Sequence, residues 1–183
     1  MSGNLKLNTA LGGSIALTPE NTASNITVTI PATTGTLLTT ATAGVPIGGP
    51  AFSAYATTAT SCANNVFAKI LFNTEEFDTN NNFSSSRFTP TVAGYYQLNA
   101  SINMDSIAST LLIGIFKNGS EYKRGVWAFG AALNSVSMSA SVYCNGSTDY
   151  VELYIYQNTG SSINTATGRE SVWFDGCLVR SAT

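Results

Sequence analysis

The chain has 183 residues, of which 44% are hydrophobic and only 10% are charged, with a net charge of −2 and no histidine. This length provides one compact domain and an additional segment, but not two full domains. The lack of histidine excludes Ser-His-Asp and Cys-His catalysis, and the lack of clustered Lys and Arg argues against nucleic acid as a ligand.

Residues 1–50 are rich in Thr, Gly and Ala and contain no aromatic side chain. Alternating apolar residues predict a strand over Asn25–Ile30 and a shorter one over Ser14–Thr18, each followed by a proline. The Gly- and Pro-containing run 43–50 cannot continue a helix or a regular ladder, so it is interpreted as a linker. We therefore divide the chain into an extended arm over 1–50 and a domain over 51–183.

The predicted arm is too small to be stable alone, because an isolated β-ribbon is marginal in water. We expect it to be held by another copy or by a larger assembly. The candidate attachment residues are the apolar members of its strands: Ile15, Leu17, Ile26, Val28, Ile30 and Leu37. The sequence shows no apolar core of a secretory signal and no segment of the ~20 apolar residues that a membrane span needs.

All the aromatic residues follow the linker, so the hydrophobic core is expected after Phe52. Short alternating segments separated by turn residues, without helical periodicity, predict an all-β antiparallel sandwich. The expected strands are Ala51–Ala56, Val66–Phe72, Arg87–Thr89, Tyr95–Asn103, Thr110–Lys117, Glu121–Phe129, Ser135–Tyr143, Tyr150–Gln157 and Ser171–Arg180.

The acidic cluster Glu75-Glu76-Phe77-Asp78 has three interpretations. The first and preferred interpretation is a solvated loop between strands. The second is calcium binding through the carboxylate oxygens of Glu75, Glu76 and Asp78. The third, weaker still, is a pair of catalytic carboxylates. No metal or cofactor is expected.

Pro90 and Gly94 predict a corner at which the chain passes from one sheet to the other. Further along, Trp127 and Phe129 with Arg124 are either a platform on which sugars stack or part of the core or of a subunit interface. The three cysteines have no metal-binding spacing and are expected to be buried free thiols, with a disulfide as the alternative.

The domain resembles the globular head of the first complement component, which is related to the tumour-necrosis-factor jelly roll. The resemblance covers residues 51 to about 180, and its strongest parts are Phe88-Thr89-Pro90, Gly94-Tyr95-Tyr96 and Lys117-Asn118-Gly119. It implies a ten-stranded jelly roll that assembles as a homotrimer around aromatic residues. The candidate trimer-interface residues are Tyr96, Tyr154, Tyr156 and Trp173.

The arm resembles a segment of tailed-bacteriophage fibre and head-appendage proteins, through Gly12–Thr18, Asn25–Pro31 and Gly35–Leu38. Together the two resemblances imply a non-enzymatic virion structural protein, made in the host bacterial cytoplasm. Its arm would attach the trimer to a major capsid, tail or neck protein, as a capsid decoration (cement) protein or a short head appendage. The alternative is the receptor-binding tip of a tail fibre that recognises host surface glycans. A carbohydrate-active enzyme and a free lectin are the rival classes.

Overall fold

The computed structural model describes residues 5–8, 14–17 and 48–182. These belong to two separate units of the chain. In the first, β1 (Leu5–Asn8) pairs with β2 (Ser14–Leu17) in an antiparallel ribbon. The strand expected over Ser14–Thr18 is therefore confirmed, and β1 is a partner that the sequence did not predict. The strand expected over Asn25–Ile30 lies outside the described residues, as do the attachment candidates Ile26, Val28, Ile30 and Leu37.

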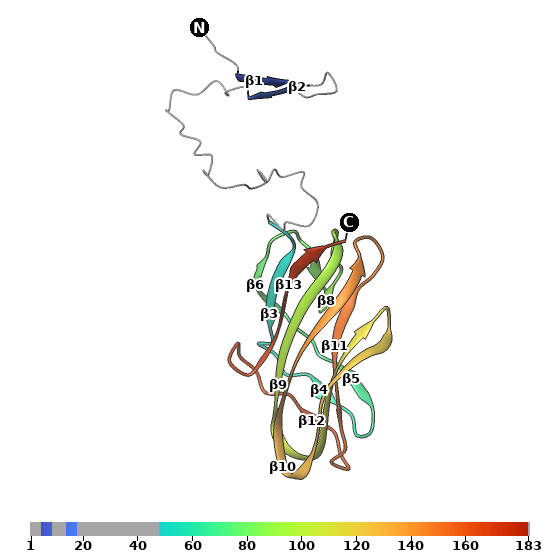
Figure 1. Cartoon of the computed structure of the whole chain (residues 1–183). Helices are drawn as coiled ribbons and strands as arrows, with labels where there is room; N and C mark the ends of the chain where they lie inside the picture. The colour runs from blue at the N-terminus through green and yellow to red at the C-terminus, as the bar shows by residue number, and fades with distance from the viewer. Residues whose placement is uncertain (1–4, 9–13, 18–47, 183) are drawn as a thin grey trace. The chain divides into compact units, whose positions relative to one another are not determined.

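Residues 48–182 form an all-β domain (Figure 1). No helix of the described chain has the length and hydrophobicity of a membrane span. The strands of the domain are β3 (Ala51–Tyr55), β4 (Ser61–Cys62), β5 (Phe67–Lys69), β6 (Thr74–Asp78), β7 (Phe83–Ser84), β8 (Arg87–Phe88), β9 (Ala93–Lys117), β10 (Ser120–Asn145), β11 (Val151–Gln157), β12 (Ile163–Asn164) and β13 (Val172–Ser181).

The strands build a nearly closed antiparallel sandwich of two layers that share β9 and β10. The first layer has the order β6-β3-β13, followed by the first part of β9 and the last part of β10. In the second layer β7 pairs with β8, and both β8 and β5 pair with β11. The last part of β9 and the first part of β10 follow on the other side of β11. Among the described strands, β10 pairs only with β9, so it is an edge strand of both layers in this part of the chain.

Two long strands replace four predicted short ones. The sequence predicted breaks between Tyr95–Asn103 and Thr110–Lys117, and between Glu121–Phe129 and Ser135–Tyr143. Instead β9 runs for 25 residues and β10 for 26. Register shifts between Phe129 and Ser135 let the ladder bend from one layer into the other without ending.

The core lies between the layers and is built around stacked phenylalanines. The ring of Phe52 on β3 lies 4.3 Å from that of Phe88 on β8 and 4.9 Å from that of Phe83 on β7. It also makes an edge contact with Phe174 on β13, at 5.0 Å. Alternation along β11 buries Val151, Leu153 and Ile155 completely, which identifies the core side of a strand whose two faces the sequence did not distinguish.

The predicted corner at Pro90 and Gly94 is confirmed. β8 pairs with β11 in the second layer, and after a bend β9 begins in the first layer beside β13. A Cβ atom at Gly94 would lie 2.5 Å from the carbonyl oxygen of Arg180, so the close approach of β13 requires glycine at this position.

All three cysteines are free. Cys62 and Cys144 are buried, as expected, whereas Cys177 is exposed on β13. Burial raises the pKa of the Cys62 and Cys144 thiols to about 11, so both are protonated at neutral pH.

Candidate functional site

An aromatic groove crosses the outer face of the second layer. Its central row is set by strand register: Phe67 lies opposite Tyr156, Tyr156 opposite Leu112, and Leu112 opposite Trp127. Leu112 and Tyr156 face away from the core, because their strand neighbours Leu111, Ile113 and Ile155 are fully buried in it. The lining residues of the groove are Phe67, Thr110, Leu112, Arg124, Trp127, Phe129, Tyr156 and Asn158.

The groove has an apolar floor and two aromatic walls. Leu112 lies at the floor and is only 4% exposed. On one side the rings of Phe67 and Tyr156 are 5.6 Å apart, and on the other those of Trp127 and Phe129 are 5.1 Å apart. Trp127 is 51% exposed and Phe129 66% exposed, so neither packs in the core of the domain.

Polar groups surround the groove. The Arg124 guanidinium donates two hydrogen bonds to the Glu121 carboxylate, at 2.7 and 2.9 Å, and lies 5.2 Å from the Trp127 ring centre. These hydrogen bonds lower the pKa of Glu121. The hydroxyl of Tyr156 donates to the side-chain oxygen of Asn65 at 2.9 Å. The structure thus brings together Trp127, Phe129 and Arg124, as predicted, whereas Phe67 and Tyr156 become recognisable only from the register of β5 and β11.

A serine-rich face covers the outside of the first layer and is defined by Gln97, Asn99, Ser137, Ser139, Ser141 and Asp175. A continuous hydrogen-bond network crosses it. Ser141 donates to Gln97 at 2.9 Å, Gln97 to Ser139 at 2.7 Å, Ser139 to Asn99 at 2.8 Å and Asn99 to Asp175 at 2.9 Å.

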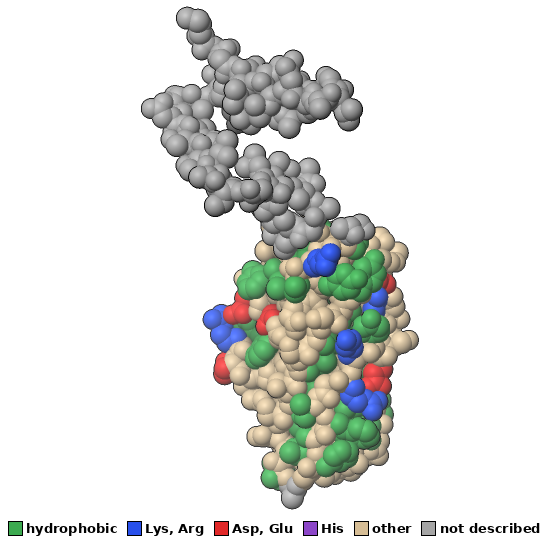
Figure 2. All heavy atoms as spheres, viewed as in Figure 1, with side chains coloured by type: hydrophobic (Ala, Val, Ile, Leu, Met, Phe, Trp, Pro, Cys, Tyr) green, Lys and Arg blue, Asp and Glu red, His purple; other side chains and the backbone are tan. Residues whose placement is uncertain are grey.

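Part of the serine-rich face borders a hollow of about 680 Å³, which also contacts Val126 and Trp173. At the same face Tyr95 and Tyr143 lie with ring centres 5.4 Å apart and are 50% and 38% exposed. Figure 2 shows, on the side it presents, mostly uncharged side chains with scattered charged ones. A surface of this kind, with few charges and some exposed apolar side chains, is suited to contact with another protein.

The four residues predicted at a trimer interface do not form one surface. Tyr96 is fully buried in the core, and its hydroxyl donates to the Val92 carbonyl at 2.6 Å, so it has no surface for a neighbouring chain. Trp173 lies on the outer side of the first layer, beside the hollow. Tyr154 and Tyr156 lie on the outer side of the second, where Tyr154 stacks on Phe116 at 4.0 Å. The sequence could not separate these positions. The alternation of side chains shows which residues share one face of a strand, but not to which layer of the sandwich that strand belongs.

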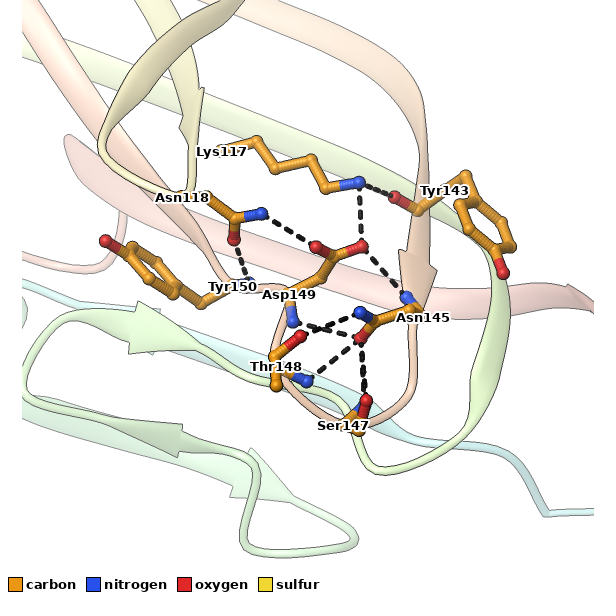
Figure 3. Close-up of polar contacts among 8 residues, drawn as sticks. All are labelled: Lys117, Asn118, Tyr143, Asn145, Ser147, Thr148, Asp149 and Tyr150. Atoms are coloured by element: carbon orange, nitrogen blue, oxygen red, sulfur yellow. Dashed lines mark hydrogen bonds and ion pairs between the residues drawn. The ribbon is translucent and has the colours of Figure 1, made fainter.

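The Lys117-Asn118-Gly119 turn is the centre of a partly buried polar network (Figure 3). Asn118 and Gly119 have φ of +53° and +81°, the backbone of a two-residue hairpin turn. The Asp149 carboxylate accepts hydrogen bonds from the Asn118 amide at 2.7 Å and the Asn145 backbone N–H at 3.0 Å, and pairs with Lys117 at 2.8 Å. This network joins the β9–β10 turn to the loop before β11, so its role is structural.

The acidic cluster is a strand and not the predicted loop. Glu75, Glu76 and Asp78 lie on β6, which pairs with β3 at the edge of the first layer, and charged side chains protect such edges from further pairing. Glu76 accepts a hydrogen bond from Ser53 at 2.8 Å, and Asp78 accepts one from the Phe83 N–H at 2.6 Å. Over the described residues, no three acidic, Cys or His side chains are grouped as a metal site would require.

Solved structures share this fold. The globular domain of zebrafish complement 1qA matches with a TM-score of 0.55 and 17% identity, over 73% of this chain and 99% of that chain. Murine APRIL at pH 5.0 matches with a TM-score of 0.57 and 10% identity, over 72% and 99%. The vertex protein P5 of PRD1 matches with a TM-score of 0.53 and 16% identity, over 72% and 97%.

These likenesses confirm the predicted fold, an antiparallel jelly roll of the complement and tumour-necrosis-factor type. At such low identity they establish the fold alone. No family model matches the sequence, and no curated protein matches it significantly.

Proposed function

We propose that this chain is a non-enzymatic structural protein of a bacteriophage particle. It is a homotrimer that is attached by residues 1–50 and displays its jelly-roll domain on the particle surface. The observation that carries the proposal is the likeness of the domain to the solved chain of the PRD1 vertex protein P5, 97% of which is covered. The likeness to complement and tumour-necrosis-factor heads supports the same type of assembly.

The serine-rich face is the proposed contact between the three copies. It carries the exposed Tyr95–Tyr143 pair, and Val179 on β13 is 55% exposed. The adjacent strand β10 has an unpaired edge along its length, which a neighbouring chain can cover. Tyr154 and Tyr156 face away from this surface, so we assign Trp173 alone of the four predicted residues to the trimer contact.

The arm is the proposed attachment segment. In the described part of it, Ile15 and Leu17 on β2 lie opposite Leu7 and Leu5 on β1. A ribbon of two four-residue strands has too little apolar surface to be stable by itself, so a partner must complete it. The partner is another virion protein, either a major capsid protein or a tail or neck protein. Three arms on one trimer turn weak single contacts into lasting attachment.

Two roles are compatible with this assembly. A capsid decoration or cement protein, or a short head appendage, uses the arm to join neighbouring capsid subunits. A tail-fibre tip uses the domain to recognise glycans on the host surface. The exposed aromatic groove supports glycan recognition, which a decoration protein could also have. The number of copies per particle separates them, because hundreds indicate decoration and a few tens at most indicate fibres.

The experiment that tests the proposal is quantitative mass spectrometry of purified particles from the phage that encodes the chain, with immunogold labelling against the domain. The expected result is the chain in stoichiometric, surface-labelled amounts, in multiples of three per attachment point. Full-length protein found free in the lysate and missing from the particles would contradict it. Polysaccharide cleavage that is lost on Glu75→Ala, Glu76→Ala or Asp78→Ala would instead identify an enzyme.

A further inference from the structure

The aromatic groove is the feature that the proposed structural role leaves unexplained. Trp127 and Phe129 keep about half or more of their surface in water although the core of the domain is closely packed. Exposed aromatic side chains that line a hollow, and are not scattered singly, mark a binding surface. The strands beneath them hold the walls in place, since Phe67 packs on Phe116, which stacks on Tyr154.

We propose that the aromatic groove binds a neutral carbohydrate, one or two sugar residues at a time. The volume of the groove is about 240 Å³. This is below the ~300–1,000 Å³ of sites for drug-sized ligands and suits one or two sugar rings. A sugar ring offers an apolar C–H face to each wall, one formed by Phe67 and Tyr156 and the other by Trp127 and Phe129.

The charges beside the groove favour a neutral ligand. Arg124 is its only charged lining residue, and Glu121 neutralises that charge through two hydrogen bonds. A guanidinium has five N–H donors, so Arg124 keeps donors for sugar hydroxyls while Glu121 holds it in position. The Ser109 hydroxyl lies 2.7 Å from the backbone carbonyl oxygen and 3.0 Å from the side-chain oxygen of Asn158, another lining residue, and the hydroxyl hydrogen is shared between these acceptors. The side-chain amide of Asn158 keeps its donors for the ligand.

The groove is separate from the proposed trimer contact. Trp127, Phe129 and Tyr156 belong to the outer face of the second layer, and the serine-rich face belongs to the first. A trimer therefore presents three grooves, and weak binding at each adds up on a surface that carries many sugars. This inference depends on the proposed virion role in one respect: that role identifies the host surface as the source of the sugar.

The test uses the full-length chain on an array of neutral and acidic glycans, followed by calorimetric titration with the methyl glycoside of the best-bound neutral sugar. The variants are Trp127→Ala and Phe129→Ala. The matched control is Phe77→Ala, because Phe77 on β6 is 51% exposed like Trp127 but lies outside the groove. All three side chains are exposed, so the variants are expected to fold, and light scattering checks that each keeps its oligomeric state.

We expect saturable binding of a neutral glycan, at least ten-fold weaker in Trp127→Ala and Phe129→Ala and unchanged in Phe77→Ala. Three results would overturn the proposal: no neutral glycan bound, binding within two-fold of the parent in both groove variants, or binding of acidic glycans alone. Loss of the trimer in Trp127→Ala would also overturn it, by identifying the groove as a subunit contact. Absence of sugar binding by the parent chain, with that chain trimeric and particle-bound, rejects this inference and leaves the structural role in place.

Discussion

The ammonium group of Lys117 lies 2.8 Å from the carboxylate of Asp149, and the two side chains are only 15% and 11% exposed. They join the β9–β10 turn to the loop before β11. The Asp149 carboxylate is also bonded to Asn118 and to the backbone of Asn145, so its charge is neutralised and its oxygens have partners. Removing one member of such a buried set leaves the others without a partner.

Asp149→Asn should lower the free energy of unfolding by about 2–4 kcal/mol, because the ammonium group of Lys117 loses its counter-charge in a poorly hydrated position. Urea denaturation at fixed protein concentration measures the change. Glu121→Gln is the matched control, since the Glu121–Arg124 pair is more exposed and should contribute less than about 1 kcal/mol. Equal effects of the two substitutions would contradict a structural role for Asp149.

Stability should fall in acid. Hydrogen bonds from Lys117 and Asn118 lower the pKa of Asp149. Burial alone would raise the pKa of Glu152, but hydrogen bonds from Lys69 and Arg87 leave it below its usual value. Both groups therefore stabilise the fold above the pKa of carboxyls in the unfolded chain, ~4, and lose this contribution as the pH falls through their lower folded-state pKa values.

The measurement is the free energy of unfolding from pH 7 to pH 2.5, which should be nearly constant to about pH 5 and then decrease. Asp149→Asn should make the decrease smaller. Asp175 acts in the opposite direction, because burial raises its pKa and its protonation favours the folded state. Asp175→Asn should therefore make the decrease steeper, and a flat profile in the parent chain would contradict these assignments.

Strand alternation made most of the sandwich predictable from the sequence. Val151, Leu153 and Ile155 alternate with larger polar-tipped residues, and this pattern separated the two faces of β11 without showing which one is buried. β6 was not predicted because its sequence contains the charged pair Glu75-Glu76 and no alternating apolar pattern. An edge strand is held by backbone hydrogen bonds to one neighbour and does not need such a pattern. The continuity of β9 and β10 was hidden as well, because the bulges that bend them have no sequence signal of their own.

The aromatic groove was only half predictable. Trp127 and Phe129 are near each other in the sequence, so their pairing could be inferred. The opposite wall comes from Phe67 and Tyr156, which are far away in the chain and reach the groove through the register of β5 and β11. Register depends on all the side chains of a layer together, so a single sequence does not specify it.

Deletion of residues 1–45 should leave a soluble trimer that no longer joins particles, because the core and the serine-rich face lie in the remaining domain. Light scattering measures the oligomeric state, and co-sedimentation with particles that lack the chain measures attachment. The substitution pair Ile15→Asp and Leu17→Asp in the full-length chain is a finer form of the test and should also prevent attachment. Truncated protein that still decorates particles would contradict the role of the arm.

Ser137→Arg should convert the proposed trimer to a monomer without unfolding it. Ser137 is exposed at the centre of the serine-rich face, and a charge there would be buried without a partner in the contact. Ser120→Arg, at the exposed first residue of β10, is the matched control and should remain trimeric. Sedimentation velocity distinguishes the species, and circular dichroism checks the fold. A trimeric Ser137→Arg variant would place the contact elsewhere on the domain.

The proposed structural role depends on the association of three copies of the domain in a homotrimer. Sedimentation equilibrium of the full-length protein tests this association most directly. The predicted mass is three times the 19.1 kDa of one chain, independent of concentration in the micromolar range. A single species with the mass of one chain at these concentrations would contradict it.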